Sequence, residues 1–229
     1  MKIHGLQKLT LLDFPEVVAC TVFLGGCDFR CPFCHNAELL DGSAEAICDE
    51  KDLLDFLWKK KGLLDGVVIT GGEPTLRPDL GKLIQEIKEI GYKVKLDSAG
   101  YHPDVLGELL GKGNIDYVAM DIKNSRERYA ETVGLDELDF SKIEKSISLL
   151  RSGSTEYEFR TTVLKQFHDA DSFKGIAELI DGAPKYFIQS FIDRETVPFA
   201  GLEAYTKEEL EAFAEIVKPH VEKIEIRGV

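Results

Sequence analysis

Three cysteines, Cys27, Cys31 and Cys34, lie within the ten-residue stretch CDFRCPFCHN. Clustered thiolates are ligands that zinc ions and iron-sulfur clusters prefer. A structural zinc site normally closes with four protein ligands, but the chain has no second CxxC pair. His35 could be the fourth zinc ligand, but it adjoins Cys34, which makes tetrahedral coordination of a single ion awkward. A four-iron cluster fits better, because three thiolates leave one iron free for a substrate or cofactor. A zinc-binding interaction module stays open as the alternative.

The other two of the five cysteines are expected to be structural. Cys20 lies within the apolar run VVACTVFL and Cys48 follows an alanine-rich turn, where a free cysteine behaves as a small hydrophobic residue. The odd count and the clustering argue against a secreted disulfide framework. No segment approaches the ~20 apolar residues of a membrane-spanning helix, and the N-terminus lacks the apolar core of a signal peptide. We therefore expect a cytoplasmic protein with no membrane partner.

Composition narrows the partners further. The 229 residues are 44% hydrophobic, which is enough for the core of one sizeable domain. The net charge is -13, from 41 acidic against 28 basic residues. Such a surface does not suit nucleic acid or anionic lipid, whereas a protein partner with a basic patch is compatible with it.

Short apolar runs alternate with amphipathic helical patterns, which is typical of βα units around a parallel sheet. Six strands are predicted, at residues 18–26, 66–72, 92–98, 117–123, 157–164 and 185–191. The nearly continuous apolar strands, and a length below the ~250 residues of an eight-unit barrel, favour a partial (β/α)6 TIM-type barrel, open on one side. A doubly wound open sheet would show the same alternation.

One domain is expected over residues 1–229. Within it we predict an N-terminal β appendage at 1–17, a six-strand barrel core at 18–191, and a C-terminal helix and short strand at 192–229. Polar residues gather late in the strands or just after them, namely Asp97, Asp121, Lys123, Arg160 and Gln189. The carboxyl ends of the strands carry the active site in α/β barrels, so these side chains are candidates for it.

The CxxxCxxC spacing directly after the first strand, with Phe33 before its last cysteine, resembles the radical S-adenosylmethionine (SAM) superfamily. GGEPT, at residues 71–75, matches the Gly-Gly-Glu-Pro turn of that family. The resemblance implies that the three cysteines hold a [4Fe-4S] cluster and that the amino and carboxylate groups of SAM chelate the open iron. It also implies reductive cleavage of SAM to methionine and a 5′-deoxyadenosyl radical.

More narrowly, CPFCHN, KLDSAG, AMDIK, FRTTV and the opening GLQKLTLLDFP together resemble activating enzymes of glycyl radical enzymes, and most of all the anaerobic ribonucleoside-triphosphate reductase activating branch. This implies a glycyl radical enzyme as partner and a flavodoxin- or ferredoxin-type electron donor. A small-molecule substrate or another glycyl radical enzyme stays open. One departure is Asp97-Ser98-Ala99-Gly100, where the family often has Asp-Thr-Asn-Gly, so any contact from that Asn side chain is absent.

Two turns are candidates for holding the amino-acid end of SAM. Gly71 and Gly72 free backbone groups beside Glu73, which suits an ammonium ligand, although Glu73 could instead cap a turn. In the resembling enzymes the aspartate at the position of Asp97, followed here by Ser98, lies near the SAM carboxylate, in some members through a monovalent cation. An aspartate alone would repel that carboxylate, so a cation or a nearby lysine is required.

Three later strands supply the remaining candidates. Asp121 and Lys123 are two apart and share a strand face, so they could bind ribose hydroxyls and a carboxylate, or form a plain salt bridge at the rim. Arg160 suits a carboxylate ligand or is an outward-facing charge. Gln189 could meet the adenine edge or be a buried amide bonded to backbone.

Residues beside the cluster complete the set. His35 and Asn36 could hydrogen-bond the cluster sulfurs or the ligand and so tune the reduction potential. Arg30, in the wide gap between cysteines, could contact the electron donor or the protein substrate. His102 and His168 lie in loop-like contexts with Asp neighbours and are expected at the surface.

Overall fold

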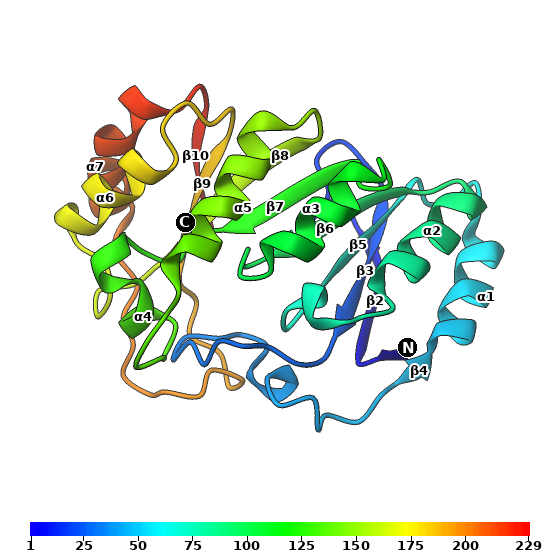
Figure 1. Ribbon diagram of the computed structural model, residues 1–229. Coiled ribbons are helices and arrows are strands. Elements are labelled where there is room, and N and C mark those ends of the chain that lie inside the picture. The colour runs from blue at the N-terminus through cyan, green and yellow to red at the C-terminus, as the bar shows by residue number, and fades with distance from the viewer.

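The main sheet has eight strands in the order β10-β9-β8-β7-β6-β5-β3-β2, as seen in a computed structural model that describes residues 1–229 (Figure 1). Six consecutive strands match the predicted ones and run parallel to one another. They are β3 (Ala19–Leu24), β5 (Gly66–Gly71), β6 (Lys93–Ser98), β7 (Tyr117–Asp121), β8 (Glu156–Val163) and β9 (Tyr186–Ser190). The strands predicted at 18–26 and 117–123 end two residues early, at Leu24 and Asp121.

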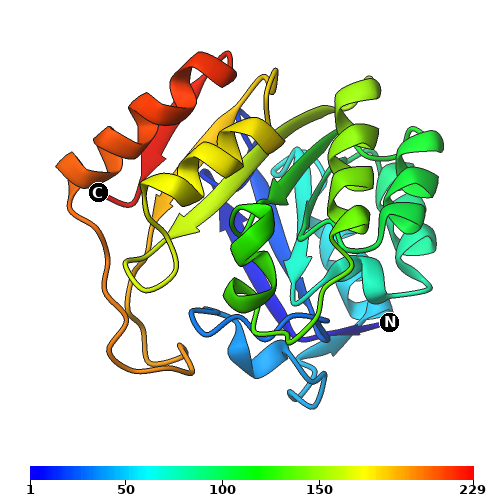
Figure 2. The same ribbon diagram turned by 60° about the vertical axis from the view of Figure 1, so that its left-hand side comes forward.

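Both ends of the chain widen this sheet beyond the six predicted strands. At one edge β2 (Gly5–Thr10) pairs antiparallel with β3, and at the other β10 (Ile224–Arg227) pairs parallel with β9. These two edge strands do not pair with each other, so the barrel is open between them, and Figure 2 shows the curved sheet running from β2 to the red β10. A separate two-stranded sheet joins β1 (Lys2–Ile3) to β4 (Cys48–Asp49).

The helices cover the outer side of the sheet (Figures 1 and 2). The longer ones are α1 (Glu50–Lys60), α2 (Leu80–Ile90), α3 (Pro103–Gly111), α5 (Phe140–Ser152), α6 (Ala170–Leu179) and α7 (Lys207–Val217). Shorter turns are α4 (Tyr129–Thr132), η1 (Ala37–Leu39), η2 (Pro74–Leu76), η3 (Arg126–Arg128) and η4 (Lys218–His220). No helix has the length and apolar character needed to cross a membrane.

Local signals explain where the helices begin and end. Asp49 and Asp52 form a capping box at the start of α1, and Thr206 and Glu209 form another at the start of α7. Gly91 ends α2 in the left-handed region, at a φ of 112°, which glycine adopts without a steric penalty.

Strand alternation divides the residues between the core and the site. On β6, Val94 and Leu96 pack into the hydrophobic core, while the flanking Asp97 points to the inner side, where a cavity lies. The same parity places Asp121 on β7 beside Arg160 on β8, because these two residues are register partners. The polar residues predicted at the strand ends therefore meet on the inner side of the open barrel.

Candidate active site

A cavity of about 370 Å³ lies at the carboxyl ends of the parallel strands. All of the predicted site residues except Glu73 line it, namely Cys27, Cys31, Phe33, Cys34, His35, Asn36, Gly71, Gly72, Asp97, Ser98, Asp121, Lys123, Arg160 and Gln189. A volume of this size is within the range of small-molecule sites. Residues from the cysteine loop and five strands thus converge on one pocket.

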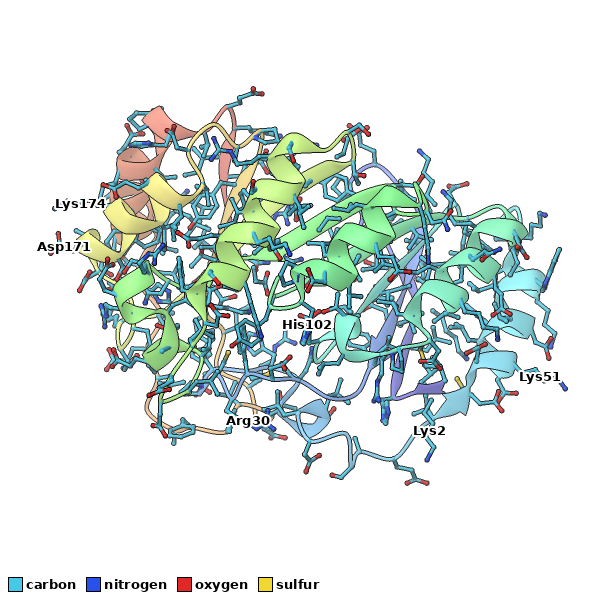
Figure 3. All side chains as sticks on the ribbon, viewed as in Figure 1. Lys2, Arg30, Lys51, His102, Asp171 and Lys174 are labelled. Atoms are coloured by element: carbon cyan, nitrogen blue, oxygen red, sulfur yellow. The ribbon has the colours of Figure 1, made fainter.

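The loop that carries the three cysteines is braced from outside the cavity. Arg30 donates hydrogen bonds through one guanidinium nitrogen to the carbonyls of Cys27 and Phe29, at 2.6 and 2.8 Å. His102 contacts Asp28, with 2.8 Å between Nε2 and Oδ2. Figure 3 shows Arg30 on this loop and His102 on the segment that leads into α3. Arg30 and His102 therefore have structural contacts that fix the loop, and His102 is only partly exposed.

The three thiols face the cavity without a fixed positive partner of their own. Burial raises the pKa of Cys27 to about 12 and that of Cys31 to about 11, and it also raises the pKa of Cys34. A buried thiolate is stabilised by direct bonding to a metal, which deprotonates its ligands. Three such thiols around one pocket, with no fourth cysteine lining it, match a cluster that keeps one iron open.

The turn after β5 requires its two glycines. A Cβ atom on Gly71, whose φ is 130°, would lie 2.1 Å from the carbonyl oxygen of Leu24, and one on Gly72 would lie 2.1 Å from that of Gly26. The amide of Glu73 donates to the Gly26 carbonyl at 2.7 Å. The glycine pair therefore lets this turn pack directly against the start of the cysteine loop.

Glu73, the one predicted site residue that does not line the cavity, lies in the turn after β5. Its side chain is buried, does not line the cavity, and accepts hydrogen bonds from the backbone of Thr75 and Ala99 and from the Ser98 hydroxyl, at 3.1, 2.7 and 2.9 Å. The Thr75 hydroxyl is a further donor. Because its oxygens are occupied, Glu73 ties the turn after β5 to the turn after β6 and positions the residues that do face the cavity.

Five charged side chains form a network on the wall of the cavity. Asp97 is contacted by Lys95 at 2.5 Å and by Arg160 at 3.2 Å. Asp121 is contacted by Arg160 at 2.9 Å and by Lys123 at 2.8 Å. Burial alone would raise the pKa of Asp121, but the adjacent Arg160 and Lys123 hold it well below its ordinary value. The Asp121 carboxylate therefore stays ionised within the site.

Sequence reasoning missed several residues of the site. Lys95, which the sequence analysis did not single out, is 1% exposed, because its position two residues before Asp97 places it on the same inner face. The alternation of side chains along a strand, with a period of two residues, was the sequence signal that could have identified Lys95. The deeper wall of the cavity also carries residues not singled out before, namely Asp13, Thr21, Thr70 and Thr162. Asp13 comes from the loop after β2 and accepts a hydrogen bond from the Thr21 hydroxyl at 2.7 Å.

His168 was expected at the surface, but it is 1% exposed. The turn before α6 packs its ring near Phe173, and its Nε2 atom lies 2.9 Å from the Lys123 carbonyl. Its Nδ1 atom accepts from the amide of Leu164 at 3.4 Å, so Nε2 carries the proton and donates to Lys123. His168 therefore supports the backbone of a cavity residue. His35, by contrast, stacks on Phe191 with ring centroids 5.8 Å apart, at the rim.

The burial of His168 predicts a pH-dependent stability. Burial lowers its pKa from 6.5 to about 4, so the folded state resists protonation while the unfolded chain does not. The stabilisation is present above pH 6.5 and is lost as the pH falls from there towards 4. Between pH 7 and pH 5 this amounts to about 2 kcal/mol. Urea unfolding of the apo protein measures this effect. From pH 7 to pH 5 the unfolding free energy of His168→Gln should fall by about 2 kcal/mol less than that of the wild type. Equal falls in the two proteins would contradict this role of His168.

The parallel strands, the inner cavity and the three-cysteine loop define a partial barrel. It can hold a cluster and a small ligand at the carboxyl ends of its strands. Residues 21–180 match the radical SAM superfamily, and the chain belongs to that superfamily. It is 31% identical over 236 residues to "Putative glycyl-radical enzyme activating enzyme MJ1227" of Methanocaldococcus jannaschii, covering 99% of this chain and 96% of that protein. It is 32% identical over 128 residues to the pyruvate formate-lyase-activating enzyme of Clostridium pasteurianum, covering 54% and 52% of the two chains.

The fold is shared with solved radical SAM structures. SuiB of Streptococcus suis, bound to its precursor peptide SuiA, superposes with a TM-score of 0.68 at 16% identity. The alignment covers 91% of this chain and 48% of SuiB. At that identity the likeness concerns the fold alone, and it confirms the predicted partial barrel.

The protein is thus a radical SAM enzyme, and its cofactors are a [4Fe-4S] cluster and SAM. The residues present fit both groups. One buried and two half-buried thiols suit the cluster, and a pocket lined by fixed charges of both signs suits a ligand that carries an ammonium, a carboxylate and a sulfonium. The zinc alternative is set aside by the family assignment.

Proposed function

We propose that this enzyme installs a glycyl radical on a partner protein, and that the partner is an anaerobic ribonucleoside-triphosphate reductase. The main support is the 31% identity to a glycyl-radical enzyme activating enzyme that extends over nearly the whole of both chains. The sequence motifs that resemble the reductase-activating branch support the choice of partner. When bound, the reduced cluster supplies the electron that cleaves SAM to a 5′-deoxyadenosyl radical, which removes a Cα hydrogen from a glycine.

In this proposal the side chains have two roles, to hold the cluster and to bind and orient SAM. Cys27, Cys31 and Cys34 hold the cluster, while the backbone of Gly71 and Gly72 receives the SAM ammonium. Lys123 and Arg160 attract the SAM carboxylate, and the apolar wall around Phe33 keeps water from the reacting atoms.

The remaining candidates line the same cavity. Ser98 and Asn36 would flank SAM there, and Asn36 also donates to the Gly71 carbonyl at 3.1 Å. Gln189, on the inner face of β9, faces the cavity where it can meet the adenine. His35, at the rim, lies where a partner or donor would approach.

The open side of the barrel suits a macromolecular substrate, because a flexible glycine loop needs a wide entrance to reach the pocket. The net charge of -13 favours a partner surface with a basic patch. A flavodoxin- or ferredoxin-type protein would deliver the electron. The cytoplasm is the proposed location, since its reducing conditions keep the five free cysteines available.

The test is to mix the anaerobically reconstituted enzyme, SAM and dithionite with an anaerobic ribonucleoside-triphosphate reductase. Electron paramagnetic resonance should show a doublet from a glycyl radical that is absent when the radical-bearing glycine is replaced by alanine. SAM cleavage without a radical on any such reductase would contradict the proposal. Deoxyadenosine formed only when a small molecule is added would instead favour the small-molecule alternative.

A further inference from the structure

Three carboxylates line the SAM pocket, and two of them, Asp97 and Asp121, have no unengaged oxygen. On Asp97, Oδ1 is 2.5 Å from the Lys95 ammonium and Oδ2 is 3.2 Å from the Arg160 guanidinium. On Asp121, Oδ1 is 2.9 Å from Arg160 and Oδ2 is 2.8 Å from the Lys123 ammonium. Each of the four oxygens therefore already accepts a hydrogen bond from a fixed cation.

The charges in this network do not cancel. Lys95, Arg160 and Lys123 contribute three positive charges against two from the aspartates, which leaves a surplus of one positive charge. These side chains are well shielded from solvent, with Lys95 at 1% exposed and Arg160 at 13%. Charges in such a setting act more strongly than they would in water. Within the network, this surplus is the complement of one ligand carboxylate; Asp13, the third carboxylate that lines the cavity, lies outside the network and bonds to Thr21.

A bound monovalent cation does not fit this arrangement. A cation at Asp97 needs carboxylate oxygens that are free to coordinate it. Here both oxygens of Asp97 are taken, and an incoming ion would be repelled by Lys95 and Arg160. The expectation of a cation at Asp97, drawn from some of the resembling enzymes, therefore disagrees with the residues present.

We propose that the Lys95 ammonium takes the place of a monovalent cation, so that this enzyme binds SAM without K⁺ or Na⁺. Lys95 does so as a positioning residue. It neutralises Asp97, and this leaves Arg160 and Lys123 able to attract the SAM carboxylate. The inference rests on the proposed seat of SAM in this cavity, and it is independent of which partner receives the radical.

The first experiment compares cations directly. SAM is titrated calorimetrically into the reconstituted enzyme with K⁺, Na⁺ or tetramethylammonium as the only monovalent cation, at equal ionic strength. The dissociation constant should agree within about twofold in all three. The change that SAM causes in the electron paramagnetic resonance of the reduced cluster should also be the same. Binding more than about tenfold tighter in K⁺ or Na⁺ than in tetramethylammonium would overturn the inference.

The second experiment creates the dependence that the wild type lacks. Lys95→Met keeps the volume but leaves Asp97 with one cationic partner, so SAM binding in tetramethylammonium should weaken by about tenfold or more and recover in K⁺ or Na⁺. Lys95→Met with Asp97→Asn should bind without a cation, because the unpaired carboxylate is gone. Weakened binding in Lys95→Met that neither ion nor Asp97→Asn restores would overturn the inference.

The control is Lys88→Met, which breaks a lysine–aspartate ion pair to Asp116 at 2.7 Å that is more exposed than the Lys95–Asp97 pair and lies outside the residues that line the SAM cavity. It should leave SAM affinity and cation independence unchanged, and altered affinity there would overturn a local role for Lys95. Absence of SAM binding by the wild type in every buffer would overturn the proposed SAM-binding site itself. Tight binding that needs K⁺ would be consistent with this binding site and would reject only the role of Lys95.

Discussion

Cys31→Ala is expected to abolish both the iron-sulfur cluster and the reductive cleavage of SAM. Cys31 lies in sequence between the other two proposed ligands and is 7% exposed, so a thiol from solvent cannot readily replace it. A cluster held by two thiolates lacks the ligation on which its assembly depends. Iron and sulfide content should fall to the level of protein that was never reconstituted, and deoxyadenosine should fall to the level without enzyme. Cys27→Ala and Cys34→Ala should behave in the same way.

Two other cysteines supply the control. Cys20 lies inside β3 and Cys48 lies in β4, and neither lines the cavity. Cys20→Ala and Cys48→Ala should therefore keep the cluster and the cleavage activity, with at most a modest loss of stability from the buried Cys20. SAM cleavage that survives in Cys31→Ala would remove the basis for the ligand assignment.

The strand positions and most of the pocket could be predicted because they depend on local pattern and a simple topological rule. Parallel strands bring their carboxyl ends to one edge, so Asp97, Asp121 and Arg160 had to meet once their strands were placed. Strand parity then decided which of their neighbours faced the pocket. Lys95 follows from the same parity, although lysine side chains are mostly exposed and the residue type alone gives no sign of burial.

The remaining residues depend on how separate segments pack, which no local pattern records. Glu73 accepts hydrogen bonds from the turn after β6, about 25 residues later in the chain, which the local GGEPT pattern does not record. His168 is buried against α6 and the carbonyl of Lys123, a residue 45 positions away. Asp13 reaches the pocket through the loop between β2 and β3, whose path into the barrel is set by tertiary contacts.

Arg160→Met is expected to weaken SAM binding by about 100-fold, because Arg160 is the one side chain that bonds to both Asp97 and Asp121. Its loss changes the surplus of one positive charge to zero and leaves one oxygen of each aspartate without a donor. Removing one partner of a buried ion pair costs about 3–5 kcal/mol, which SAM binding and stability would share. Calorimetric titration of SAM, with a thermal unfolding curve for each variant, measures the two parts separately.

The comparison that isolates the pocket uses Arg126→Met, which removes a guanidinium from an ion pair with Glu144 that is about half exposed on both sides. Exposed pairs contribute only about 0–1 kcal/mol, so SAM affinity and the unfolding temperature should both stay near those of the wild type. Arg160→Lys keeps the charge but cannot reach both aspartates with a planar fork, so its SAM affinity should fall between those of the wild type and Arg160→Met. If Arg160→Met lowered the unfolding temperature yet bound SAM as tightly as the wild type, the guanidinium would be a purely structural bridge, and the surplus charge would have to act through Lys123 alone.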